Sequence, residues 1–182
     1  MLELSLHILD IVENSTRAGA GLVGISVEED RAADRFRIEI SDDGPGMDEE
    51  TRAKAVDPFY TTRTVRRVGL GLPLFRQAAQ AANGSFSIRS GARGGTTVSA
   101  EFQWSHIDRQ PLGDMASTLG TLIAGNPGVD FVYTHLRDGA AYTIDTRDIR
   151  KEIGDVPLDH PDVLRIIGDD IREGLRNINA DQ

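Results

Sequence analysis

The chain has 182 residues and a formal net charge of −9 at pH 7, with 20 Lys and Arg against 29 Asp and Glu. This length fits one domain of ordinary size, or one domain with a sizeable extension. The absence of cysteine excludes disulfides, thiolate metal sites and thiol nucleophiles. No apolar run approaches the roughly 18–20 residues of a membrane span, and the N-terminus lacks the pattern of a signal peptide. We therefore expect a soluble, cytoplasmic protein.

Acidic charge dominates both halves of the chain. Residues 1–103 carry 12 Lys and Arg against 15 Asp and Glu, and residues 104–182 carry 8 against 14. General nucleic-acid binders have a basic excess, so no nucleic-acid partner is expected. A local exception is "TTRTVRR", where Arg63, Arg66 and Arg67 cluster. Taken alone, this cluster is typical of a solvated loop.

The first 103 residues alternate between helical and strand patterns. Apolar side chains at helical spacing predict a helix over residues 2–18. A short helix is predicted over 48–56, and a longer one after the glycines of 68–71, ending at Gly84. Strands are predicted over 22–29, 35–43, 85–91 and 94–104. These elements predict an α+β fold, a two-layer α/β sandwich with a mixed, mainly antiparallel sheet covered by helices on one face.

Residues 104–182 predict a helix, a β-hairpin and a second helix, an α-β-β-α extension of a domain formed by residues 1–103. The first helix covers residues 113–126, and Asp138-Gly139 joins two strands as a hairpin turn. Asp159 is a candidate cap for the last helix. No motif is recognised here. The extension either completes the fold, for example by covering an exposed sheet edge, or serves as a dimerisation element, a docking surface or a transducer of nucleotide state.

Asp10 and Asn14 lie four residues apart on the first predicted helix, so their side chains share one face. A carboxylate and an amide oxygen in this arrangement suit Mg²⁺, which prefers oxygen ligands and keeps several waters. The same pair is also compatible with an ordinary polar helix face.

Two glycine-rich turns follow. "SDDGPGM" stands at a strand end, where Asp42 and Asp43 would repel a phosphate, so a nucleotide would have to contact this turn through another part. "VGLGLPL" places Gly69 and Gly71 just ahead of a helix. The free N–H groups and positive dipole end of a helix N-terminus favour phosphate binding.

The order of five segments is more specific than any one of them. "DIVENSTRAGA", "DDGPGM", "DPFYTT", "VGLGLPL" and "GGTTVSAEF" together resemble the GHKL (Bergerat-fold) ATPase superfamily, which includes histidine-kinase catalytic domains, DNA gyrase B, Hsp90 and MutL. The resemblance covers about residues 3–103. Its later segments look most like a histidine-kinase catalytic domain, and its first helix looks more like that of MutL. It implies a Bergerat fold, with ATP and Mg²⁺ as cofactors.

The resemblance also implies roles for individual residues. Asp43 matches the aspartate of the D-x-G-x-G turn, which accepts a hydrogen bond from the adenine amino group, and Gly44 and Gly46 let the backbone approach the base. Asn14 matches the Mg²⁺ ligand. Thr97, or its neighbour Thr96, matches the threonine that supports the aspartate. The remaining positions expected around the nucleotide and its phosphates are Met47, Phe59, Thr62, Arg63, Arg66, Arg67, Gly69, Leu70, Gly71 and Leu72.

Asp10 departs from the family pattern. Its position usually holds Glu in gyrase- and MutL-like hydrolases, where that residue activates water, and Asn in histidine kinases. Asp10 is therefore a candidate base with a shorter reach, and Glu13 is an adjacent candidate. We expect slow ATP hydrolysis, and the sequence is also compatible with no hydrolysis. None of the four histidines fits a phosphoacceptor, and the first helix begins close to Met1, so we do not expect a self-contained histidine kinase.

The leading hypothesis is a cytoplasmic Mg-ATP-binding regulatory protein, a stand-alone kinase-like partner or nucleotide-dependent switch. It would act on an unidentified protein partner or phosphoacceptor, and a homodimer is compatible with it. One alternative is a MutL- or gyrase-like ATP-hydrolysing dimer clamp, for which only Lys54 and Lys151 could supply a lysine to the γ-phosphate. A third is a nucleotide-binding module without catalysis.

Overall fold

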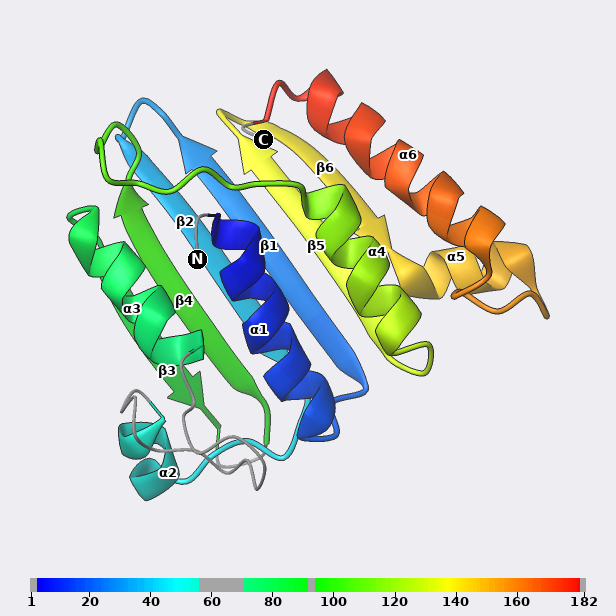
Figure 1. The fold of residues 1–182 in the computed structure, drawn as a ribbon, viewed down its shortest axis with the longest axis horizontal. Coiled ribbons are helices and arrows are strands. Elements are labelled where there is room, and N and C mark those ends of the chain that lie inside the picture. Colours follow the sequence, from blue (N-terminus) through cyan, green and yellow to red (C-terminus); the bar gives the residue numbers. More distant parts are fainter. Residues whose placement is uncertain (1–2, 56–70, 92–93, 181–182) are drawn as a thin grey trace.

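A six-stranded mixed sheet forms the centre of the molecule (Figure 1). The computed structural model describes residues 3–55, 71–91 and 94–180. The strand order is β3-β4-β2-β1-β5-β6, and every neighbouring pair is antiparallel except β1 and β5, which are parallel. The strands are β1 (Leu22–Asp30), β2 (Arg35–Asp42), β3 (Ser85–Ser90), β4 (Thr96–Gln103), β5 (Asp130–Arg137) and β6 (Ala140–Asp145).

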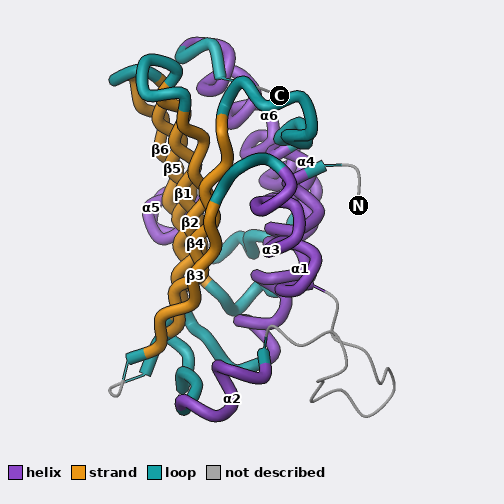
Figure 2. The backbone as a smooth tube through the Cα atoms, turned by 90° about the vertical axis from the view of Figure 1, so that its left-hand side faces the viewer, coloured by secondary structure: helices purple, strands orange, loops and turns teal. Residues whose placement is uncertain are grey.

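Helices α1 (Leu4–Arg17), α3 (Gly71–Ala81) and α4 (Met115–Gly125) cover one face of the sheet (Figures 1 and 2). Helix α6 (Pro161–Asn177) packs against α4 and β6, and the short α2 (Glu49–Lys54) follows β2. This arrangement confirms the predicted α+β sandwich. The sequence did not predict α5 (Thr146–Ile153), which lies on the opposite face (Figure 2). No described helix is both long and apolar enough to cross a membrane.

The core forms because side chains alternate along the strands and recur every three or four residues along α1. In β1 and β2 every second side chain is buried toward the helices, and α1 buries one stripe against them. These buried residues are Leu4, Ile8, Ile11 and Val12 of α1, Val23, Ile25 and Val27 of β1, and Phe36, Ile38 and Ile40 of β2. Burial of this stripe fixes the rotation of α1, and with it the direction of its polar side chains.

The C-terminal part of the chain continues the same sheet. Strand β5 runs beside β1 from the Leu22–Asp130 pair to the Glu29–Arg137 pair. At the latter end His135 Nε2 lies 2.6 Å from Glu29 Oε1, and both side chains are fully buried. Tyr133 Oη lies 2.7 Å from His135 Nδ1. A buried polar cluster therefore joins the C-terminal hairpin to β1.

The segment between β4 and α4 crosses over the start of α1 (Figure 1). Helix α1 has no side-chain cap. Instead, the N–H of Leu4 donates to the carbonyl of Pro111 at 3.0 Å, and the N–H of Ser5 donates to Leu112 at 2.7 Å. The first-turn N–H groups of a helix need such partners. The last helix also differs from expectation, because His160 rather than Asp159 is its N-cap.

Candidate functional site

Asp42, the last residue of β2, lies where α1, β4 and the following turn meet. Its Oδ2 accepts a hydrogen bond from Ser15 Oγ of α1 at 2.6 Å. Its Oδ1 accepts from the backbone N–H of Gly44 at 3.0 Å and from that of Thr96 at 3.2 Å. Three donors from three segments thus fix the orientation of this carboxylate.

Thr96 is the threonine that shares a face with Asp42. The two residues are directly opposite in the β2–β4 ladder, whereas Thr97 is opposite Ser41. Side chains alternate between the faces of a sheet, so Asp42 and Thr96 point toward the helices and Thr97 points away. Of the two threonines left open by the sequence, the geometry favours Thr96.

Asp43 lies outside this cluster. Its Oδ1 accepts hydrogen bonds from the N–H groups of Gly21 and Leu22, at 2.8 and 2.9 Å, and the residue is exposed. The N–H of Leu22, supported by that of Gly21, lowers the pKa of this carboxyl below its ordinary value. Asp43 therefore ties the β2 turn to the α1–β1 connection.

For the role that the sequence analysis gave to Asp43, this geometry favours Asp42, and the role itself stays a prediction. The signal was present in the sequence, because the spacing D-x-G-x-G is met by Asp42, Gly44 and Gly46, one residue earlier than Asp43. Because two carboxylates are adjacent in the sequence, the sequence alone does not show which of them points toward the helices.

The glycine turn after Asp42 is closely packed. Gly44 is buried, and Gly46 has a φ of 78°, a conformation that side chains rarely adopt. A Cβ on Gly46 would lie 2.8 Å from Ser90 Oγ. That hydroxyl accepts from the N–H of Met47 at 2.6 Å and donates to the carbonyl of Gly95 at 2.9 Å. Met47 thus contributes its backbone N–H, and the Ser90 hydroxyl links the turn to the β3–β4 hairpin.

Asp10 of α1 lies against the start of α3. Gly71 is the first residue of α3 and is buried, and a Cβ on it would collide with the Asp10 carboxylate. The next residue, Leu72, is partly buried against the core. The structure therefore brings the candidate base to the helix N-terminus at which the sequence analysis placed the phosphates.

Asn14 and Glu13 are both linked to Arg17. Asn14 Oδ1 accepts from Arg17 Nη1 at 3.1 Å, and Glu13 forms an exposed ion pair with the same guanidinium. Glu13 thus has a partner at the surface, whereas Asp10 faces α3.

The described residues contain no group of three or more His, Cys, Asp or Glu side chains that could hold a metal. Asp10 and Asn14 supply two oxygen donors one helical turn apart. This donor set fits Mg²⁺, which completes its octahedron with water and phosphate oxygens, and does not fit a metal that needs a protein cage.

Several predicted site residues lie outside the described residues, so the structure does not place them. They are Phe59, Thr62, Arg63, Arg66, Arg67, Gly69 and Leu70.

Comparison with known proteins identifies the family of the chain. The model of the family described as "Histidine kinase-, DNA gyrase B-, and HSP90-like ATPase" matches residues 2–106, which is more than half of the chain. The chain belongs to this ATPase family. The match ends just beyond β4, so every described element of the site lies within it.

Curated relatives of this ATPase-family chain include bacterial kinases. It is 40% identical over 57 residues to the sensor protein kinase FleS of Pseudomonas aeruginosa, a match that covers 31% of this chain and 14% of FleS. It is 30% identical to PilS of the same organism over 98 residues, covering 51% of this chain and 18% of PilS. Sporulation kinase B of Bacillus subtilis is 30% identical over 99 residues, covering 53% and 22%. The chain thus matches less than a quarter of the length of these relatives.

Two solved structures share the fold at 17% identity. The N-terminal domain of a DNA repair protein aligns with a TM-score of 0.53, over 79% of this chain and 52% of that one. The MutL ATPase domain of Aquifex aeolicus, complexed with ADP, aligns with a TM-score of 0.51, over 80% and 63%.

Proposed function

We propose that this protein is a Mg-ATP-binding regulatory protein, which acts as a kinase-like partner or nucleotide-dependent switch for another protein. The observation that carries the proposal is the oriented Asp42 carboxylate, held by Ser15, Gly44 and Thr96. The kinase relatives and the family membership support the same reading.

In this proposal Asp42 recognises the adenine base. Its carboxylate accepts a hydrogen bond from the exocyclic amine of adenine, a donor that guanine lacks at that position. The Ser15 hydroxyl and the two backbone N–H groups hold the carboxylate in a fixed orientation before the base arrives. Thr96 supports the same carboxylate from β4.

The phosphates bind near the N-terminus of α3, next to Asp10. Asn14 and Asp10 hold the magnesium ion, which when bound neutralises phosphate charge. Asp10 also serves as the general base for an attacking water or hydroxyl, in preference to Glu13, because the Asp10 carboxylate lies against the start of α3, where the phosphates bind. The shorter reach of aspartate agrees with slow turnover.

An ATP-hydrolysing clamp is the second candidate. Its support is the likeness of the first helix to that of MutL and the shared fold. A clamp requires an ATP-dependent dimer, so light scattering with and without a non-hydrolysable ATP analogue distinguishes it from a switch that stays monomeric.

The first test is calorimetric titration with ATP and ADP, with and without Mg²⁺. Asp42→Asn should weaken ATP binding by more than about tenfold. The Asn side chain presents to the adenine amine either its NH₂ group, which cannot accept a hydrogen bond, or its neutral oxygen, which cannot form a charge-assisted one. Asp43→Asn is the matched control and should bind ATP almost as the wild type does. Loss of binding in Asp43→Asn alone would return the role to Asp43, and failure of the wild type to bind either nucleotide would refute the proposal.

A further inference from the structure

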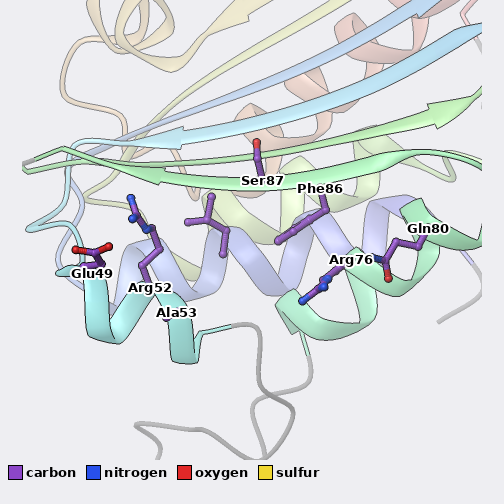
Figure 3. Close-up of a pocket in the computed structure, with 8 residues that line it drawn as sticks. Glu49, Arg52, Ala53, Arg76, Gln80, Phe86 and Ser87 are labelled. Atoms are coloured by element: carbon purple, nitrogen blue, oxygen red, sulfur yellow. The ribbon is translucent and has the colours of Figure 1, made fainter.

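A groove of about 340 Å³ lies between α2, α3 and the outermost strand of the sheet (Figure 3). It is separate from the Asp42 cluster. Its lining consists of Glu49, Arg52, Ala53, Arg76, Gln80, Phe86, Ser87 and Ile88. Helix α2 contributes the first three of these residues, α3 contributes the next two, and β3 contributes the last three.

The groove opens onto the edge of β3 itself. Phe86, Ser87 and Ile88 are consecutive, and their side chains alternate between the two faces of the sheet. All three line the same groove, which is possible because the groove follows the backbone that joins them. Within residues 3–55, 71–91 and 94–180, strand β3 is the first in the sheet order and pairs on one side only, with β4.

The free backbone groups of this edge can be assigned from the hairpin. The N–H of Gly91 donates to the carbonyl of Gly95, in register with the β3–β4 ladder. Bonded and non-bonded pairs alternate in an antiparallel ladder, so Ser85, Ser87 and Arg89 bond to β4. The N–H and C=O groups of Phe86 and Ile88 therefore point outward, into the groove.

The side chains around these groups are apolar at the floor and basic at the rim. Phe86 and Ile88 are partly buried against the core. Arg52 and Arg76 make no ion pair or hydrogen bond with another residue that the structure describes, and Glu49 is the one carboxylate of the lining. In a protein with a net charge of −9, these two guanidinium groups, which have no partner among the described residues, form a local basic site beside β3.

We propose that this groove binds an extended, acidic segment of a partner protein, which pairs with β3 as a seventh strand. The backbone of the segment bonds to Phe86 and Ile88, and its apolar side chains on the helix side of the sheet cover the same two residues. Carboxylates at flanking positions on that same side approach Arg52 and Arg76. Addition of a strand to an open edge is an established mode of peptide recognition. The inference does not rest on the proposed nucleotide function.

The test uses a fluorescent peptide of sequence Glu-Ser-Val-Ser-Val-Ser-Glu-Ser, whose Val and Glu side chains share one face of an extended strand. It is titrated with the full chain and followed by fluorescence anisotropy. We expect saturable binding, and binding at least about tenfold weaker for the matching basic peptide with Lys in place of Glu. Two further forms of the acidic peptide are methylated on alternate backbone nitrogens, in one phase or the other. The phase that removes the donors facing β3 should abolish binding, and the other phase should retain it.

The protein variant is Arg52→Gln combined with Arg76→Gln, with Arg165→Gln and Arg172→Gln on the exposed side of α6 as the matched control. The first pair of changes should weaken binding of the acidic peptide about tenfold and the second pair should not. Thermal unfolding checks that both variants fold. Equal affinity for the acidic and basic peptides, equal effects of the two methylated forms, or no effect of the Arg52 and Arg76 changes would each overturn the proposal.

Discussion

The hydroxyl of Ser15 donates to the Asp42 carboxylate at 2.6 Å, across 27 residues of sequence. Ser15 is on α1 and Asp42 ends β2, so this bond joins the helix that carries Asp10 and Asn14 to the strand end that we assign to the base. The two halves of the proposed nucleotide site are therefore coupled by one charge-assisted hydrogen bond.

Ser15→Ala should weaken both the fold and the site. Ser15 is 8% exposed, and the loss of a hydrogen bond to a charged group costs about 1.5–3 kcal/mol. We expect a comparable loss in the free energy of unfolding by urea, and a several-fold loss in ATP affinity by calorimetry. Thr16→Ala, which removes a hydroxyl that donates to the Glu13 carbonyl of the same helix, is the control. Equal effects of both substitutions would argue against a special role for the Ser15–Asp42 bond.

Asp10→Asn should separate catalysis from binding. The amide keeps an oxygen for Mg²⁺ but cannot accept a proton, so phosphate release should fall by at least about 100-fold while ATP binding stays within a few-fold. Glu13→Gln should leave phosphate release nearly unchanged, because Glu13 is paired with Arg17 at the surface. A larger loss in Glu13→Gln than in Asp10→Asn would exchange their roles. If the wild type releases no phosphate, transfer to a protein acceptor becomes the activity to test.

The sequence predicted most of the described elements, because their signals are local. Alternation marks β1 and β2, glycines mark the ends of α1 and α3, and Asp138-Gly139 marks the hairpin. The choice between Asp42 and Asp43 was harder, because it depends on which face of the sheet a side chain points to. That direction follows from the pairing with Thr96, a contact over 54 residues.

Contacts at long range account for the rest. The parallel pairing of β5 with β1 and the buried Glu29–His135 bond, which spans 106 residues, leave no local pattern. Helix α5 has a single buried residue, Thr146, and only Ile149 and Ile153 form its apolar stripe, which is too short to predict a helix on its own. The caps that α1 receives from Pro111 and Leu112 are backbone groups and are equally invisible in the sequence.

His7 should make the stability of the fold depend on pH. It is 1% exposed, lies 5.4 Å from the Phe75 ring and is 3.2 Å from Gln110 Oε1. Burial lowers the pKa of its imidazole below 6.5. The unfolded chain then binds the proton more tightly, so the stabilisation is complete above pH ~6.5 and is lost as the pH falls below it.

Urea unfolding between pH 5 and 8 measures this dependence. For His7→Phe, the slope below pH ~6.5 should decrease by up to about 1.4 kcal/mol per pH unit, the limit for one proton. The control is His160→Asn, which changes an exposed histidine but keeps an acceptor at the N-cap of α6. An unchanged slope in His7→Phe would show that His7 does not titrate with unfolding.

Gly84 and Gly120 should respond in opposite ways to alanine. A Cβ on Gly84 would collide with the backbone carbonyl of Glu101 in β4, and its own N–H is bonded to Ala79 at 2.9 Å, so neither side can move away. Gly120 lies within α4, and apart from its chain neighbours and the helix's own backbone no described atom lies within 4 Å of its Cβ position. We expect Gly84→Ala to lower the free energy of unfolding by about 3 kcal/mol, and Gly120→Ala to raise it by about 0.5–1 kcal/mol. Because α3 and the groove at β3 both depend on the turn at Gly84, a stable Gly84→Ala protein would show that this turn lies farther from β4 than the structure has it.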